Sequence, residues 1–138
     1  MQVEFALFCE AAEISPNGLM YILHGGYDQI SSSEFPAVLR RMALVVRLLC
    51  EPSECGQQQV FISQIVGPHA NAVPPDMTCN FTTSYHPRDR TRRNRMTLLL
   101  DYWNLSFPEP ADYVFRFIAG GVQIGEAVLE LTKIQNES

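Results

Sequence analysis

Lysine is almost absent from this chain. Of its ten lysine and arginine residues only Lys133 is a lysine, charged residues make up 18% of the sequence, and the formal net charge is -5. Proteins that bind nucleic acids generally present a basic face. The acidic composition, with a pI near 5.1, therefore argues against a general nucleic-acid-binding role.

Targeting segments and long apolar runs are also missing. The first ten residues carry no basic region, and their apolar part is too short for a secretory signal. No run approaches the roughly 18 apolar residues that a membrane-spanning helix needs. We therefore expect a cytoplasmic protein that does not bind membranes.

Cysteine and histidine residues are too few and too scattered for a disulfide-stabilised fold or a metal centre. Cys50 and Cys55 stand close enough for half of a metal site, but no second pair follows at the spacing of zinc ligands. The three histidines lie far apart in sequence. We predict free thiols and no metal or cofactor, with a disulfide or a metal-bound pair as the alternatives. The residues concerned are Cys9, Cys50, Cys55, Cys79, His24, His69 and His86.

A proline corner is the clearest structural signal that the chain does contain. Phe107-Pro108-Glu109-Pro110 cannot continue a strand, because each proline lacks an amide hydrogen and has a fixed φ. Strict alternation begins at Tyr113, which places Phe115 and Phe117 on the same face. This pattern is typical of a tyrosine corner, in which two strands cross between sheets. We expect Tyr113 to be buried, with its hydroxyl bonded to nearby backbone.

Alternating segments separated by turn residues predict an all-β chain. We expect strands over residues 2–8, 19–24, 27–30, 40–50, 57–66, 77–85, 96–107, 112–119 and 122–134, with 67–76 as a loop. The alternation over 77–85 places the Tyr85 side chain toward the core. Tyr102 and Trp103 are adjacent in one strand, so their side chains must lie on opposite faces of the sheet. Residues 1–138 then form one antiparallel immunoglobulin-like β-sandwich of seven to nine strands. An eight-stranded barrel is the alternative.

Several of these segments also resemble a known family. Val3–Glu10, Pro16-Asn17-Gly18 and Gly26–Ile30 form one group, and the Phe107–Tyr113 corner with a glycine-containing final hairpin forms another. Together they look like an uncharacterised bacterial family of short immunoglobulin-like domains. Ala111 stands where that family usually has glycine. The resemblance implies a β-sandwich over nearly the whole chain, and it transfers no activity and no catalytic residue.

The arginine loop, residues 86–95, is the main candidate for a functional site. It contains Arg88, Arg90, Arg92, Arg93 and Arg95, and the rest of the chain has five basic residues against fourteen acidic ones. Guanidinium groups bind carboxylates and phosphates through paired hydrogen bonds. An acidic protein surface or a second copy of the chain is the expected partner. Nucleic acid or phosphate is a weaker alternative, because only Tyr85 is near enough to stack on a base. A merely solvated loop is the third interpretation.

We predict a non-enzymatic binding or assembly module. His24-Gly25-Gly26 imitates the oxyanion loop of esterases, but no G-x-S-x-G nucleophile motif occurs in the chain. A diglycine bulge explains the same residues. The alternative is a small-ligand-binding domain or an undetected enzyme, with a site near His24, Tyr27 and Asp28. A pocket in which those polar groups converge would distinguish the two readings.

Overall fold

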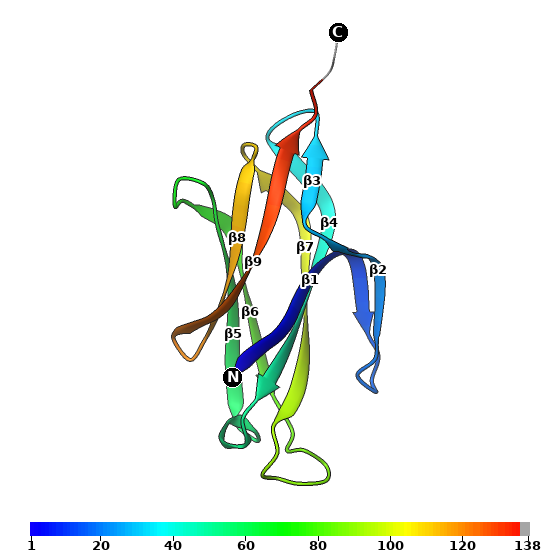
Figure 1. The fold of residues 1–138 in the computed structure, drawn as a ribbon, viewed down its shortest axis with the longest axis vertical. Helices are drawn as coiled ribbons and strands as arrows, with labels where there is room; N and C mark the ends of the chain where they lie inside the picture. Colours follow the sequence, from blue (N-terminus) through cyan, green and yellow to red (C-terminus); the bar gives the residue numbers. More distant parts are fainter. Residues whose placement is uncertain (136–138) are drawn as a thin grey trace.

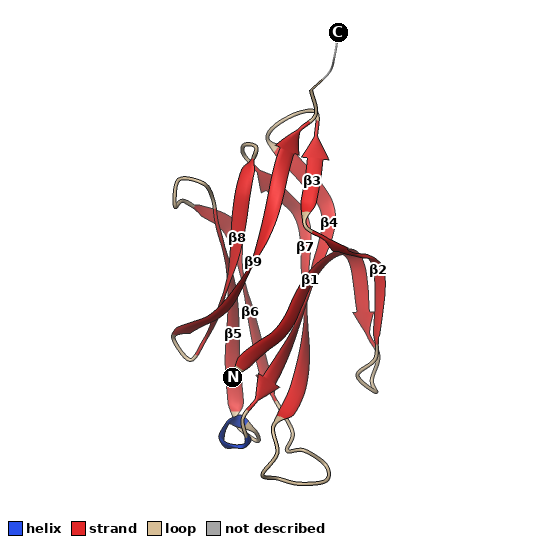
Figure 2. Ribbon diagram, in the orientation of Figure 1, coloured by secondary structure: helices blue, strands red, loops and turns tan. Residues whose placement is uncertain are grey.

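The chain folds as nine strands and one short 3-10 turn in a computed structural model that describes residues 1–135 (Figures 1 and 2). The elements are β1 (Gln2–Ile14), β2 (Met20–Tyr27), β3 (Gln29–Ser32), β4 (Ala37–Cys50), η1 (Pro52–Glu54), β5 (Gln58–Val66), β6 (Ala72–Thr82), β7 (Asn94–Phe107), β8 (Ala111–Ala119) and β9 (Val122–Lys133). The prediction of an all-β chain is confirmed. No helix within these residues is long and apolar enough to cross a membrane.

The strands form two sheets that face each other across one core (Figure 1). One sheet has the order β2-β1-β4-β7, and the other has the order β3-β9-β8-β5-β6. Phe115 of β8 shows how the sheets meet, because its ring centroid lies 4.9 Å from that of Phe8 on β1 and 5.8 Å from that of Tyr102 on β7. The sheets are therefore joined by interlocking aromatic side chains.

The apolar segment 40–50 lies at the centre of its sheet. Strand β4 lies between β1 and β7, and every residue from Met42 to Val46 is fully buried. The face that carries Met42 and Leu44 packs into the main core. The opposite face, with Ala43 and Val45, packs against Cys9 in a second, smaller apolar cluster. Burial on both faces explains why this segment reads as a continuous apolar run.

The tyrosine corner is present. Tyr113 is fully buried, its hydroxyl donates to the Glu109 carbonyl at 2.7 Å, and the same oxygen accepts from the Glu109 amide at 3.2 Å. Its ring packs edge-on against Phe107 with centroids 4.7 Å apart. Burial raises the pKa of the Tyr113 hydroxyl above its usual range. Because β7 and β8 belong to different sheets, the corner carries the chain from one sheet to the other, as the sequence predicts.

Several expectations about the strands are wrong. Residues 72–76 belong to β6 although they include Pro74 and Pro75, whereas the sequence predicts a loop. Strand β6 is at the edge of its sheet, where a proline needs no ladder partner on its open side. Strand β3 runs parallel to β9, so the pairing is not purely antiparallel. An edge strand of four residues is too short for its sequence to indicate whether it pairs in the parallel or the antiparallel direction.

The side chain of Tyr85 also departs from its predicted place. Strand β6 ends at Thr82, Thr83 is buried, and Tyr85 is exposed in the loop that follows. The inward alternation therefore stops before Tyr85.

The hairpin of β1 and β2 leaves its sheet partway along (Figure 1). Strand β1 pairs with β4 only as far as Cys9, opposite Ala43, and its remaining residues pair with β2 alone. The register shifts between Phe8 and Cys9, across from Gly26, whose φ of 89° favours glycine. The diglycine is thus a bulge inside β2, and it lets the hairpin diverge from β4.

Candidate functional site

The arginine loop joins β6 to β7 at one end of the molecule, and its backbone is held by local hydrogen bonds. The Asp89 carboxylate accepts from the Thr91 amide at 2.9 Å and from the Thr91 hydroxyl at 2.6 Å. These two bonds lower the pKa of Asp89. At the loop's base, the Asn94 side chain donates to the Ser84 carbonyl at 2.8 Å. The loop therefore has a defined turn rather than a random course.

The five arginines are not equivalent. Arg95 lies on β7, and its Nε contacts both carboxylate oxygens of Glu4, at 2.8 and 3.1 Å. The Arg90 guanidinium stacks over the Tyr85 ring, 4.2 Å from its centroid. Arg88, Arg92 and Arg93 are exposed and form no ion pair with any residue in 1–135. Three of the five predicted site residues are thus available to a partner.

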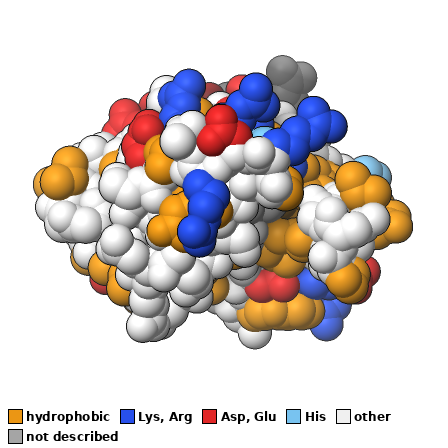
Figure 3. Space-filling model, turned by 90° about the horizontal axis from the view of Figure 1, so that it is seen from below, with side chains coloured by type: hydrophobic (Ala, Val, Ile, Leu, Met, Phe, Trp, Pro, Cys, Tyr) orange, Lys and Arg blue, Asp and Glu red, His pale blue; other side chains and the backbone are white. Residues whose placement is uncertain are grey.

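Basic side chains project from this end of the molecule in Figure 3. Some acidic side chains lie among them on the same face. Nucleic-acid binding usually needs one broad, continuous basic surface. The basic groups at this end are instead separated from one another by other side chains.

The structure does not bring together the residues of the second predicted site. The exposed His24 ring is 2.7 Å from a Glu10 carboxylate oxygen, while the Tyr27 hydroxyl donates to the Cys9 carbonyl at 3.1 Å. Burial raises the pKa of Tyr27 to about 12. Asp28 contributes its backbone carbonyl, which accepts from the Glu130 amide at 2.9 Å. Neither of the two pockets described for residues 1–135 is lined by His24, Tyr27 or Asp28.

The cysteines are free thiols, three of them buried. Burial raises the pKa of all four above the usual range of a thiol. This is the opposite of what a reactive or metal-binding thiolate requires. Within residues 1–135, no three histidine, cysteine, aspartate or glutamate side chains are grouped closely enough to hold a metal ion.

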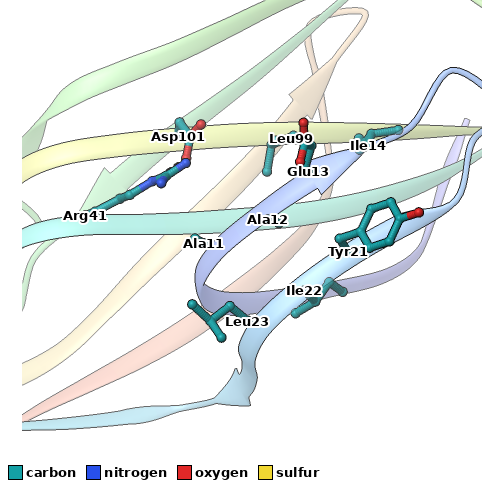
Figure 4. A pocket seen from close by; sticks show the side chains of 10 residues that line it. All are labelled: Ala11, Ala12, Glu13, Ile14, Tyr21, Ile22, Leu23, Arg41, Leu99 and Asp101. Atoms are coloured by element: carbon teal, nitrogen blue, oxygen red, sulfur yellow. Dashed lines mark ion pairs between the residues drawn. The ribbon is translucent and has the colours of Figure 1, made fainter.

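A groove that the sequence does not reveal lies beside the diverging hairpin (Figure 4). It has a volume of about 810 Å³. One wall is the hairpin, and the other wall is formed by β4 and β7. The lining residues are Ala11, Ala12, Glu13, Ile14, Tyr21, Ile22, Leu23, Arg41, Leu99 and Asp101. We call this feature the hairpin groove.

The charged groups of the hairpin groove are incompletely matched. Arg41 Nε is 3.6 Å from Asp101 Oδ1, which is too long for a hydrogen bond, and that oxygen is buried with no hydrogen-bond partner among residues 1–135. The Arg41 guanidinium also stacks over the Trp103 ring, 4.7 Å from its centroid. With the Glu13 carboxylate, the groove has two acidic groups and one basic group.

Exposed apolar side chains surround the hairpin groove. Trp103 is 63% exposed, Tyr21 66% and Leu23 53%, whereas Tyr102 is buried in the core. The expectation that Tyr102 and Trp103 face opposite sides is confirmed, with Trp103 as the exposed ring. The sequence contains one hint of this surface, the uncharged run Leu19–Leu23. The groove itself depends on β4 and β7 residues whose position beside the hairpin no local pattern shows.

One of the solved structures that match this chain shows a distant similarity. The Pseudomonas fluorescens alkylpurine DNA glycosylase AlkC, bound to DNA containing an abasic site analogue, matches 76% of this chain with 14% identity and a TM-score of 0.49. The chain spans 28% of that protein's length. No curated protein matches this sequence.

The comparison with protein families is more informative. A single family model matches residues 4–132. This range includes every strand from β2 to β8, the arginine loop and the hairpin groove. The chain therefore belongs to the family of unknown function DUF6941.

Proposed function

We propose that this protein is a non-enzymatic binding module that docks an acidic protein surface through its arginine loop. The observation that carries the proposal is that Arg88, Arg92 and Arg93 are exposed without ion-pair partners among residues 1–135, on a loop whose turn is fixed by Asp89 and Thr91. A fixed turn reduces the ordering cost of binding. Guanidinium forks then pair with carboxylates on the partner.

Two observations favour a protein partner over nucleic acid. Arg90 already covers Tyr85, so the aromatic ring that immediately precedes the loop is engaged. The body of the protein is acidic, and an acidic body repels a long phosphate backbone.

Arginine substitution would test the proposal. The triple variant Arg88→Gln, Arg92→Gln, Arg93→Gln should bind an oligoglutamate peptide at least about tenfold more weakly than the wild-type protein, since charge-assisted bonds are worth ~1.5–3 kcal/mol each. The double variant Arg40→Gln, Arg116→Gln is the control, because both side chains are exposed outside the loop. Fluorescence anisotropy at two salt concentrations is the measurement, and binding should weaken with salt.

Two outcomes would reject the proposal. If the triple variant binds the peptide as well as the control does, the loop is only a solvated connection. If a single-stranded oligonucleotide binds more tightly than the peptide, the nucleic-acid alternative is correct. Sedimentation velocity over a range of protein concentrations distinguishes a second copy from a different partner.

The finer fold class and the compartment belong to the same proposal. The tyrosine corner between two facing sheets supports an immunoglobulin-like sandwich. Four unlinked cysteines are what the reducing cytoplasm maintains, so they support a cytoplasmic location. A periplasmic or secreted location found by cell fractionation would contradict the second point.

A further inference from the structure

The hairpin groove is bordered by a strand edge without a partner. Beyond Cys9, the edge of β1 that faces β4 pairs with no strand in the described part of the chain, because pairing with β4 ends there and β2 occupies the opposite edge. The hydrogen bonding at the hairpin turn determines which backbone groups of β1 are not bonded to β2. The Ser15 amide donates to the Leu19 carbonyl at 2.8 Å. Since antiparallel ladders alternate, the backbone groups of Ala12 and Ile14 point away from β2 and toward β4.

The two edge strands of the five-stranded sheet are protected against strand addition. Strand β6 contains Pro74 and Pro75, and β3 is four residues long. The open edge of β1 has neither a proline nor such a short length, and the hairpin beside it carries the uncharged run Leu19–Leu23, in which every residue but Met20 is exposed. An open, apolar strand edge is the usual place for an extended segment to be added to a sheet.

The charges of the groove indicate what such a segment should contain. Glu13 and Asp101 supply two carboxylates against the single guanidinium of Arg41, which is shared with the Trp103 ring. Asp101 Oδ1 is buried, and no hydrogen-bond donor within residues 1–135 reaches it. A buried acceptor of this kind costs free energy until a donor reaches it. A basic side chain on an incoming strand would supply both the donor and the missing positive charge.

We propose that the hairpin groove is a second binding site, which takes an extended peptide segment of a partner protein by strand addition to residues 11–14 of β1. The segment alternates apolar residues with polar ones and carries one lysine or arginine. Its backbone bonds to Ala12 and Ile14, its apolar side chains contact Leu23 and Leu99, and its basic side chain reaches Asp101. This site is separate from the arginine loop and does not depend on the function proposed for that loop.

Peptide selection tests this inference without a known partner. The wild-type protein and the double variant Leu23→Ser, Asp101→Asn are each used to select from a random peptide library displayed on phage. Wild-type protein should enrich peptides with alternating apolar residues and one basic residue, and the double variant should not. Leu23 is exposed and Asp101 is only partly buried, so neither change removes a core contact. Melting curves establish that the variants are folded.

The best enriched peptide, labelled with a fluorophore, is then titrated against single variants. Asp101→Asn and Leu23→Ser should each weaken binding about tenfold, the equivalent of ~1.4 kcal/mol. The control Val122→Ser changes an apolar residue that is 63% exposed on the other sheet, and it should have no effect. NMR shifts of the amides in 11–14 and 99–101 should change on binding.

Three results would overturn the inference. The first is equal enrichment by the wild-type protein and the double variant. The second is enrichment of peptides that lack a basic residue. The third is a dimer in sedimentation velocity that Asp101→Asn dissociates, because the groove would then hold a second copy of this chain rather than a partner peptide.

Discussion

The hydroxyl of Tyr113 stabilises the corner at which the chain passes from one sheet to the other. Its oxygen both donates to and accepts from the backbone of Glu109, so it closes the loop that contains Pro108 and Pro110. The ring is buried against Phe107. The hydroxyl therefore fixes the corner, while the ring belongs to the core.

The substitution Tyr113→Phe separates these two contributions. It should lower the free energy of unfolding by about 1–2 kcal/mol, since the Glu109 amide and carbonyl lose a partner while the ring stays. Urea denaturation measures this loss. Tyr21→Phe is the matched control, because Tyr21 is 66% exposed, and it should change stability by less than about 0.5 kcal/mol. Equal effects of the two substitutions would show that the corner bond does not stabilise the fold.

At the scale of elements, the β1–β2 hairpin depends on Gly25. A Cβ atom at this position would collide with Cγ2 of Ile22 and would lie 3.4 Å from Leu7 Cδ1. Ile22 therefore lies across the glycine backbone at the place where the hairpin leaves the sheet. Glycine is needed here for close approach rather than for an unusual φ.

The substitution Gly25→Ala should loosen the hairpin without unfolding the core. We expect amide exchange in residues 20–24 to become several-fold faster, while exchange in β4 and β8 stays unchanged. Hydrogen exchange followed by NMR measures this difference. A double-mutant cycle gives the control: Gly25→Ala should have little effect in an Ile22→Ala background, because the colliding group is then gone. An effect of the same size in both backgrounds would refute the contact.

The same elements show what the sequence can and cannot predict. Segments with a local signal were predictable, such as the apolar run of β4 and the proline corner before Tyr113. Strand β6 was partly missed, because proline is compatible with a strand only at an edge, and edge position depends on the whole sheet order. The pairing of β3 with β9 joins residues about 100 positions apart, and no local pattern encodes it.

The candidate sites divide in the same way. The arginine loop is recognisable in the sequence as a cluster of positive charge. The contact of Arg95 with Glu4 is not, because it joins the start of β7 to β1 and depends on how these strands are arranged in the fold. The hairpin groove brings Arg41 and Asp101 beside residues 11–14 only because β1 diverges from β4 at the bulge. The sequence has no signature of the divergence, and none of the lack of a donor to Asp101 Oδ1 among residues 1–135.

At the scale of the whole molecule, buried ionisable groups couple stability to alkaline pH. Burial raises the pKa of Tyr102 and of Tyr27 from 10.0 to about 12. Between these values the unfolded chain has lost protons that the folded chain still holds. The unfolded state therefore binds fewer protons, and the free energy of unfolding falls as pH rises.

We expect stability to be highest below about pH 9, where the thiols of the unfolded chain begin to lose their protons. Between pH 10 and about 12, Tyr102 alone should lower the free energy of unfolding by roughly 1.4 kcal/mol per pH unit. The four cysteines add a decrease in the same direction, because burial raises their pKa as well. Urea denaturation at a series of alkaline pH values measures the slope. Tyr102→Phe should make the slope shallower, whereas Phe117→Leu, a core change without a titrating group, should lower stability equally at every pH. A stability that is constant or rises over this range would contradict the prediction.

The single lysine gives the molecule one side-chain amine for chemical coupling. Lys133 ends β9 at the end of the long axis opposite the arginine loop, and the amino group of Met1 is already paired with Glu54 at 2.8 Å (Figure 1). Amine-directed coupling to a sensor surface would therefore favour one attachment point and one orientation. Molecules immobilised in this way would present both the arginine loop and the hairpin groove to the solution, so the two proposed sites could be probed on the same surface with different ligands.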